Sequence, residues 1–355
     1  MENTSPLEQV NRFRPQIMGF AALWILFFHM WQPLFSESGV KALFYAENVT
    51  KRLGFEGVDF FFLLSGVGLT YSVKKHSLWQ FYLRRFKRLA IPFVIIAAIR
   101  AVLEHWGWYG FFFVVSGANF FIGNMYFCLW FVTAITVIYL IFPLYWHFFS
   151  NSRHKLVFTV VAIAVWYALS VALIGVMKTD MYGFTNRIPV FLIGVFFGWY
   201  VQNEKCRLSA GKTLIIAAIF TMAGLVLSFL CNFRALEFKL PESNCCLPDL
   251  LTATGGSVLL AAFFAILDRP CSLTRAINRA LAFIGGISLE FYCVQEYFGG
   301  QVVNVLSGKV PNIIVNAAVL IAVILLAWLL HKLNSYIWLG IENAVKKDKK
   351  SPEKA

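Results

Sequence analysis

The chain has 355 residues, of which 59% are hydrophobic, 17% aromatic and only 14% charged, and its formal net charge is +13. A soluble domain cannot bury that share of apolar side chains, so the composition indicates a polytopic membrane protein of the all-α class. The Lys and Arg residues lie in short segments between apolar stretches. Membrane insertion produces this pattern, so nucleic acid is not expected as a partner.

A membrane-spanning helix needs about 20 mostly apolar residues, and by that measure the sequence predicts about ten spans in one bundle. They lie near residues 17–35, 55–73, 89–106, 125–148, 155–177, 187–202, 213–232, 248–267, 281–299 and 311–333. The stretch 107–123 is short, aromatic and interrupted by glycine, so we predict that it is interfacial or re-entrant. With this arrangement most basic residues fall on the side of the two termini, which the positive-inside tendency assigns to the cytoplasm.

The linkers between the spans are too short to hold a second domain. We therefore predict one membrane domain over residues 1–333. Residues 334–355 are predicted to be a cytoplasmic juxtamembrane segment with a basic tail, which favours contact with anionic membrane lipids.

The first span carries a single histidine, His29, in an otherwise apolar sequence. An ionisable group is costly inside a bilayer, so it usually faces a cavity and marks a pathway or a reaction site. The alternative is an interfacial histidine near a helix end. Counting the rise of 1.5 Å per residue along each predicted span brings Asp59, Glu290 and Glu296 to depths near that of His29.

Several short sequence segments follow one another in an ordered series. They are RFRPQIMGFAALWILFFHM, GFEGVDFFFLLSGVGLTYS, FYLRRFKRLAIP, MYFCLWFVTAITVIYLIFP, NRIPVFLIGVFFG and FIGGISLEFYCVQEYF. Their order and spacing, through most of the chain, resemble the acyltransferase-3 family of integral-membrane O-acyltransferases.

This resemblance implies transfer of an acyl group, commonly acetyl from acetyl-CoA, to a hydroxyl of a carbohydrate or of a lipid-linked glycan. It also implies a location in the bacterial plasma membrane. No metal is expected, because the seven cysteines show neither a CxxC pair nor Cys/His ligand spacing. The identity of the acceptor and the oligomeric state are left open.

Two positions depart from the family's pattern. Met18 stands where members usually carry an arginine eleven residues before the histidine of the first span. Arg14, about 60° away from the His29 face of that helix, is the best available substitute. Gln295 stands where related sequences often carry a second histidine, and a glutamine can orient a substrate but cannot exchange a proton near neutral pH.

Acyl transfer to a hydroxyl needs a base, a group that orients the base and donors for the developing oxyanion. Within the resemblance, His29 is suited to be the base. Asp59 is our first candidate to orient it and Glu290 the second, although Asp59 has the alternative of capping its helix near the headgroups. The residues predicted to contact the substrate are Tyr126, Trp130, Gln295 and Glu296.

The segment FYLRRFKRLAIP places Arg85 and Arg88 on one helix face. Their planar guanidinium groups can each hold a phosphate through two hydrogen bonds. We therefore predict that these two arginines, together with Arg14, bind the CoA donor. The alternative is that the basic residues only fix the orientation of the chain in the membrane.

Two other classes of function are left open. A transporter or flippase for a glycan precursor would have the same hydropathy and buried polar groups, although the sequence shows no pair of broken helices in two related halves. A catalytically inactive relative is the other alternative, and the departures at Met18 and Gln295 favour it.

Overall fold

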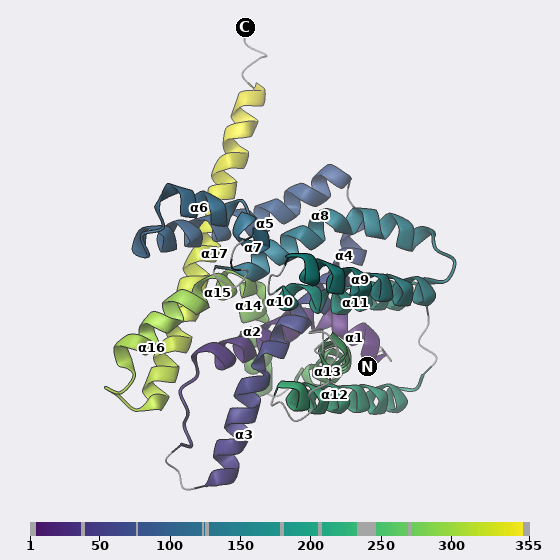
Figure 1. Ribbon diagram of the computed structural model, residues 1–355, viewed down its shortest axis with the longest axis horizontal. Coiled ribbons are helices and arrows are strands. Elements are labelled where there is room, and N and C mark those ends of the chain that lie inside the picture. The colour runs from purple at the N-terminus through teal and green to yellow at the C-terminus, as the bar shows by residue number, and fades with distance from the viewer. Residues whose placement is uncertain are drawn as a thin grey trace.

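The computed structural model describes residues 5–36, 40–75, 77–122, 124, 128–177, 181–204, 208–232, 246–268 and 272–350. Every regular element in this part of the chain is a helix (Figure 1), which confirms the all-α class. In chain order the elements are α1 (Pro6–Arg12), α2 (Arg14–Met30), α3 (Lys41–Arg52), the 3₁₀ helix η1 (Leu53–Glu56), α4 (Gly57–Val73), α5 (Leu78–Leu103), α6 (Gly107–Val115), α7 (Ala118–Ile122), α8 (Trp130–Asn151), α9 (Lys155–Met177), α10 (Tyr182–Thr185), α11 (Arg187–Asn203), α12 (Ala210–Asn232), α13 (Cys246–Leu267), α14 (Ser272–Gly286), α15 (Ser288–Val294), the π-helix η2 (Gln295–Gly299), α16 (Gly300–Leu306) and α17 (Asn312–Lys350).

Serine hydroxyls cap the first turns of α1 and α5. The hydroxyl of Ser5 accepts from the Glu8 amide while the Glu8 carboxylate accepts from the Ser5 amide, which is the capping box that opens α1. Ser77 caps α5 through a single hydrogen bond, in which its hydroxyl accepts from the amide of Gln80. Pro15 lies in the first turn of α2, where its missing N–H has no helical partner to lose.

Seven helical segments are long and apolar enough to cross a membrane. They are Lys41–Val73, Trp130–Asn151, Lys155–Ile174, Gly183–Asn203, Ala210–Cys231, Cys246–Leu267 and Asn312–Ala344. The bent pair Ser272–Gly286 and Ser288–Leu306, at 68° to one another, makes an eighth if it forms one span. The described chain is therefore that of a polytopic membrane protein, with seven or eight candidate spans where the sequence predicted about ten.

Two predicted spans account for the difference. α2 has only 17 residues, and α5 carries Lys87, Arg88 and Arg100 along its apolar length. Both are helical where the sequence predicted helices. The aromatic stretch 107–123 forms α6 and α7, of 9 and 5 residues, which are too short to cross a bilayer.

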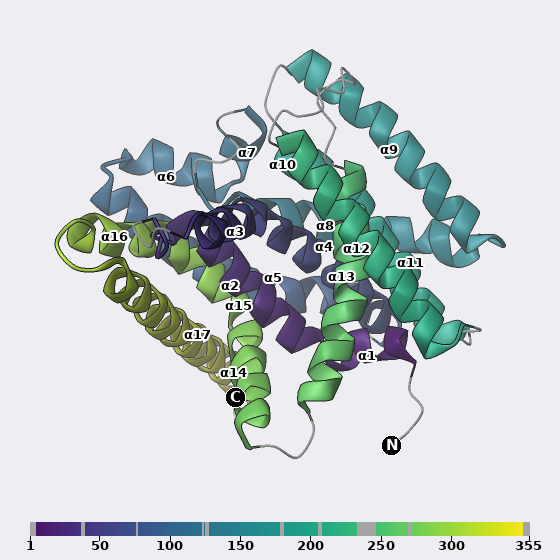
Figure 2. The same cartoon turned by 90° about the horizontal axis from the view of Figure 1, so that it is seen from below.

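α2 runs through the middle of the bundle (Figures 1 and 2) and packs against α14 at very close range. A Cβ atom on Gly19 would lie 2.0 Å from the Leu281 carbonyl oxygen, and one on Gly285 would lie 1.8 Å from the carbonyl oxygen of Pro15. Only glycine permits this approach, which is typical of helix pairs inside membranes.

α4 runs antiparallel to α2. Gly57, at its start, faces Ile25 late in α2, whereas Gly68, near its end, faces Arg14 at the start of α2. On one flank of the bundle α9, α11, α12 and α13 lie side by side (Figure 2), and α16 and α17 form the opposite flank.

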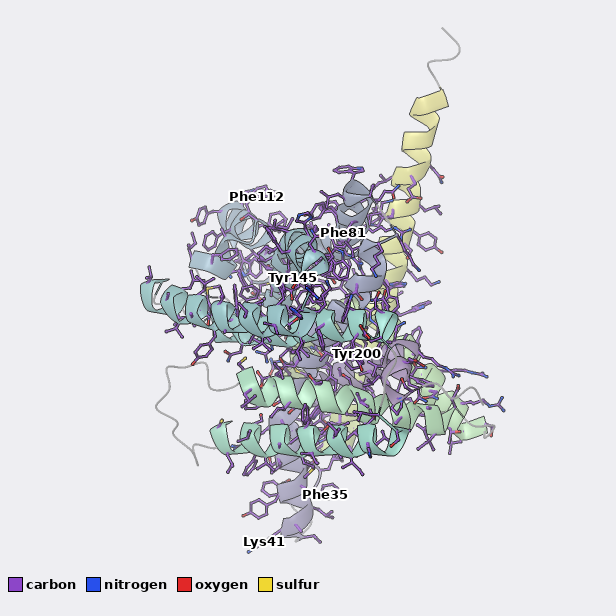
Figure 3. All side chains as sticks on the ribbon, turned by 90° about the vertical axis from the view of Figure 1, so that its right-hand side faces the viewer. Phe35, Lys41, Phe81, Phe112, Tyr145 and Tyr200 are labelled. Carbon is purple, nitrogen blue, oxygen red and sulfur yellow. The ribbon has the colours of Figure 1, made fainter. Side chains whose placement is uncertain are left out.

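α3 projects away from the bundle, and Phe35 and Lys41 mark that projecting part in Figure 3. α17 continues without a break from Asn312 to Lys350, so the predicted domain boundary at residue 333 falls inside one helix. Residues 346–350 of the predicted basic tail are helical as well. The rest of that tail, 351–355, lies outside the described residues.

Candidate active site

A cavity lies between α2, α4, α5, α8 and α15. Its walls are mostly apolar and include Met18 and Ile25 of α2. The polar residues among those that line it are Ser65, Arg88, Tyr139, Ser288 and Tyr292. Its volume is about 50 Å³, so it is small, but an apolar wall with a few polar groups is the lining that small-molecule sites usually have.

Three arginines gather at one end of this cavity, which we call the Arg14 end. The guanidinium of Arg14 lies against α4, since a Cβ on Gly68 would be 2.2 Å from its Nη1 atom. Arg14 is close enough to Arg85 and Arg88 for the three positive charges to interact. Arg88 also donates to the carbonyl oxygen of Gly286 at 3.5 Å.

Arg85 is held by hydroxyl and aromatic groups. Its Nη2 donates to Ser72 Oγ at 2.8 Å, and the guanidinium lies 5.3 Å from the ring of Tyr139 and 5.4 Å from that of Phe81. In the part of the chain that the structure describes, no carboxylate pairs with Arg14, Arg85 or Arg88. Because three like charges repel, this cluster is arranged to bind an anion.

His29 lies at the other end of α2, in its last turn. It follows Arg14 by 15 residues, which is about 22 Å along the helix axis. The His29 side chain is exposed at the surface of the described chain, its ring packs edge-on against Phe28 at 4.8 Å, and it has no hydrogen bond among the described residues. We call this the His29 end.

The cavity wall on α2 ends at Ile25, one turn before His29. Two aromatic side chains of the wall pack on each other, with the ring centres of Phe131 and Tyr292 5.3 Å apart. The Phe131 amide donates to the Tyr292 hydroxyl at 3.2 Å. These two rings therefore form one packed part of the cavity wall.

The backbone that follows His29 is fixed by two other helices. Glu47 of α3 accepts from Trp31 Nε1 at 2.7 Å, and the side chain of Asn316 on α17 both accepts from and donates to the Gln32 backbone at 2.8 Å. Glu47 is only 8% exposed. The end of α2 is thus held in place from both sides.

Asp59 and Glu290, which we expected near His29, are paired with other side chains. The Asp59 carboxylate is 3.4 Å from Nη2 of Arg187, and Glu290 Oε1 is 2.9 Å from Nδ1 of His331. We expected these carboxylates near His29 because of their depth along the predicted spans. Depth, however, does not fix the direction in which a side chain points. No hydrogen bond in the described structure joins either carboxylate to His29, and their assigned roles stay predictions.

The predicted substrate residues lie away from the cavity wall or outside the described residues. The ring of Trp130 lies 5.7 Å from the guanidinium of Arg187. Gln295 is buried in η2, and the half-buried Glu296 interacts with the charge of Arg100. Tyr126 lies outside the described residues.

Several residues of the site were not predicted. Ser65, Ser288 and Tyr139 line the cavity, but hydroxyls in apolar helices are common and gave no distinguishing signal. The sequence could have marked Arg187 and His331 as candidates, because each is an ionisable residue in or at the start of a predicted span. Their partners, however, come from distant parts of the sequence.

A comparison with protein families matches residues 18–332 to the acyltransferase-3 family, Acyl_transf_3, described as an acyltransferase domain. The match covers most of the chain, including α2 from Met18 onward and the other four helices around the cavity, so the chain belongs to this family of membrane acyltransferases. Comparisons with curated proteins and with solved structures found no match.

Proposed function

We propose that the protein transfers an acetyl group from acetyl-CoA to a hydroxyl of a surface or lipid-linked polysaccharide in the bacterial plasma membrane. Family membership supports acyl transfer. The observation that carries the choice of donor is the cluster of Arg14, Arg85 and Arg88, which has no carboxylate partner among the described residues and lies beside the cavity.

The donor phosphates would bind at the Arg14 end. CoA carries a diphosphate and a further phosphate on its ribose, and arginine binds such groups through two parallel hydrogen bonds. The faces of Phe81 and Tyr139 beside Arg85 favour a fixed guanidinium plane. This end would face the cytoplasm, where the basic residues of the loops concentrate and where acetyl-CoA is made.

The acceptor hydroxyl would reach the enzyme at the His29 end. Neutral His29 accepts the hydroxyl proton while the hydroxyl oxygen attacks the thioester carbonyl carbon. A C–O bond forms, the C–S bond breaks, and the CoA thiolate receives the proton from His29. Because the Tyr292 hydroxyl accepts from the Phe131 amide, its own O–H is available to donate to the oxyanion.

Two measurements test this proposal. Purified protein in nanodiscs, incubated with radiolabelled acetyl-CoA and a membrane glycan fraction, should transfer label to the glycan. Mass spectrometry of surface glycans from cells with and without the protein should differ by one acetyl group per modified residue. If no label is transferred from acetyl-CoA or from a longer acyl-CoA, the proposal is contradicted and an inactive relative is favoured.

A further inference from the structure

Three carboxylates from two separate helical segments meet inside the bundle, away from the cavity. Glu56 and Asp59 come from the junction of η1 and α4, and Asp249 comes from the first turn of α13. One oxygen of each lies within 4.8 Å of the others. Their exposures are 0%, 0% and 1%, so water does not hydrate them from the surface.

The charges of this group do not balance within the described residues. Three ionised carboxylates carry three negative charges, and Arg187, 3.4 Å from Asp59, supplies one positive charge. Both oxygens of Asp249 lack a hydrogen-bond partner. Two uncompensated charges inside a membrane bundle are very unfavourable, so something else must neutralise them.

A buried hydroxyl also points into the group. Thr252, one turn after Asp249 on α13, is 0% exposed, and its Oγ1 faces the Glu56 carboxylate without a well-formed hydrogen bond to any described group. Ser228 of α12 interacts with the same carboxylate. Three helical segments, the η1–α4 junction, α12 and α13, therefore bring oxygen atoms to one place, and oxygen atoms are the ligands of hard cations.

The number and kind of the ligands favour one cation over another. Ca²⁺ is held in flexible sites built from several protein oxygens at about 2.3–2.6 Å, whereas Mg²⁺ requires near-ideal octahedral geometry, keeps several waters and is usually held by one or two carboxylates. Three buried carboxylates, with one oxygen of each within 4.8 Å of the others, fit Ca²⁺ better. A divalent cation would also cancel the two remaining negative charges.

We propose that Glu56, Asp59 and Asp249, with the hydroxyl of Thr252, form a binding site for one divalent cation of the size of Ca²⁺. The bound ion ties α4 to α13 at the place where Arg187 brings in α11. It therefore stabilises the helices that hold one wall of the cavity.

The wild-type protein gives the direct test. Protein purified in detergent and freed of metal with a chelator should bind one ⁴⁵Ca²⁺ per chain, and its thermal unfolding temperature should rise with Ca²⁺ and less with Mg²⁺. A ligand that binds only the folded state raises the free energy of unfolding by about 2.7 kcal/mol when its concentration is a hundred times its Kd. The proposal is overturned if the wild type binds no Ca²⁺ and its unfolding temperature does not change with Ca²⁺ but falls as the pH is raised. In that case protons, and not a cation, neutralise the carboxylates.

Variants locate the site. Glu56→Gln and Asp249→Asn should remove the bound ion, and Thr252→Val, of nearly the same shape, should weaken ⁴⁵Ca²⁺ binding at least several-fold without unfolding the chain. The matched control is Asp268→Asn, which removes an exposed carboxylate paired with Arg12 and should leave binding unchanged. Unchanged ⁴⁵Ca²⁺ affinity in Thr252→Val and Asp249→Asn would place the ion elsewhere and overturn the assignment.

Discussion

Glu290 of α15 and His331 of α17 lie 2.9 Å apart, between Oε1 and Nδ1, and this contact joins two residues that are 41 positions apart in the chain. The Glu290 side chain is 1% exposed, whereas that of His331 is 37% exposed. The pair therefore presents a histidine towards the outside of the bundle and hides the carboxylate behind it.

Removing one partner of this pair should destabilise the protein. His331→Ala leaves the buried Glu290 oxygen without its partner, which costs about 1–3 kcal/mol for a buried acceptor. Thermal unfolding of His331→Ala, Glu290→Gln and the double variant forms a double-mutant cycle. If the stability losses of the two single variants simply add up in the double variant, the contact between the two side chains contributes nothing to stability.

His29→Ala should abolish acyl transfer while the protein still folds, because general-base catalysis contributes typically 10²–10⁴-fold to a rate. Label transfer from acetyl-CoA and thermal unfolding of the purified variant are the measurements. His147→Ala, at an exposed histidine of α8, is the control and should keep full activity. Normal transfer by His29→Ala would remove His29 from the proposed chemistry.

Arg85→Lys and Arg88→Lys should each lower CoA affinity about tenfold, which corresponds to about 1.4 kcal/mol. Lysine keeps the charge but loses the planar fork that holds a phosphate. CoA binding is measured by calorimetry in nanodiscs, with Arg84→Lys on the exposed side of α5 as the control. Equal affinities in all three variants would mean that the charges serve only to orient the chain.

Arg14→Ala should strongly reduce kcat/KM for acetyl-CoA, since it removes one of the three charges at the Arg14 end. Met18 and Arg88 line the same cavity, so an arginine at position 18 reaches the same region. Met18→Arg should therefore restore part of the activity of Arg14→Ala. A fully active Arg14→Ala enzyme would show that Arg14 does not replace the family's arginine.

Gly285→Ala should prevent folding or destabilise the protein by several kcal/mol, because its Cβ would lie 1.8 Å from a backbone oxygen that cannot turn aside. Gly286→Ala is the matched control, since a Cβ on Gly286 meets nothing within 4 Å. Expression level and thermal unfolding compare the two variants. Equal stability would contradict the close contact between α2 and α14.

The helices could be predicted from the sequence because apolar length and helix signals are local. The proximity of Arg85 and Arg88 followed from their spacing of three residues on one helix. Arg14 was chosen as a substitute for a missing charge, and the structure does bring it to the other two.

The surroundings of Asp59 and Glu290 could not be predicted, since they depend on the rotation of each helix about its axis. Asp59 and Arg187 are far apart in the sequence, and so are Glu290 and His331. A single sequence fixes the depth of such residues but not which neighbouring helix each one faces. The structure has seven or eight candidate spans where about ten were predicted, because α2 is short and α5 carries basic residues, although both are helical.

The π-helix η2 has a consequence for comparing this chain with others. A π turn holds one residue more than an α turn, so the side chains of Gln295–Gly299 lie at other angles around the helix than they would in a regular α-helix. Gln295 is the first residue of that turn. A homologue with one residue fewer there would place a different side chain where Gln295 now lies, and a column-by-column alignment would pair residues that occupy different faces. The residue equivalent to the family's second histidine must therefore be chosen by its angular position around the helix.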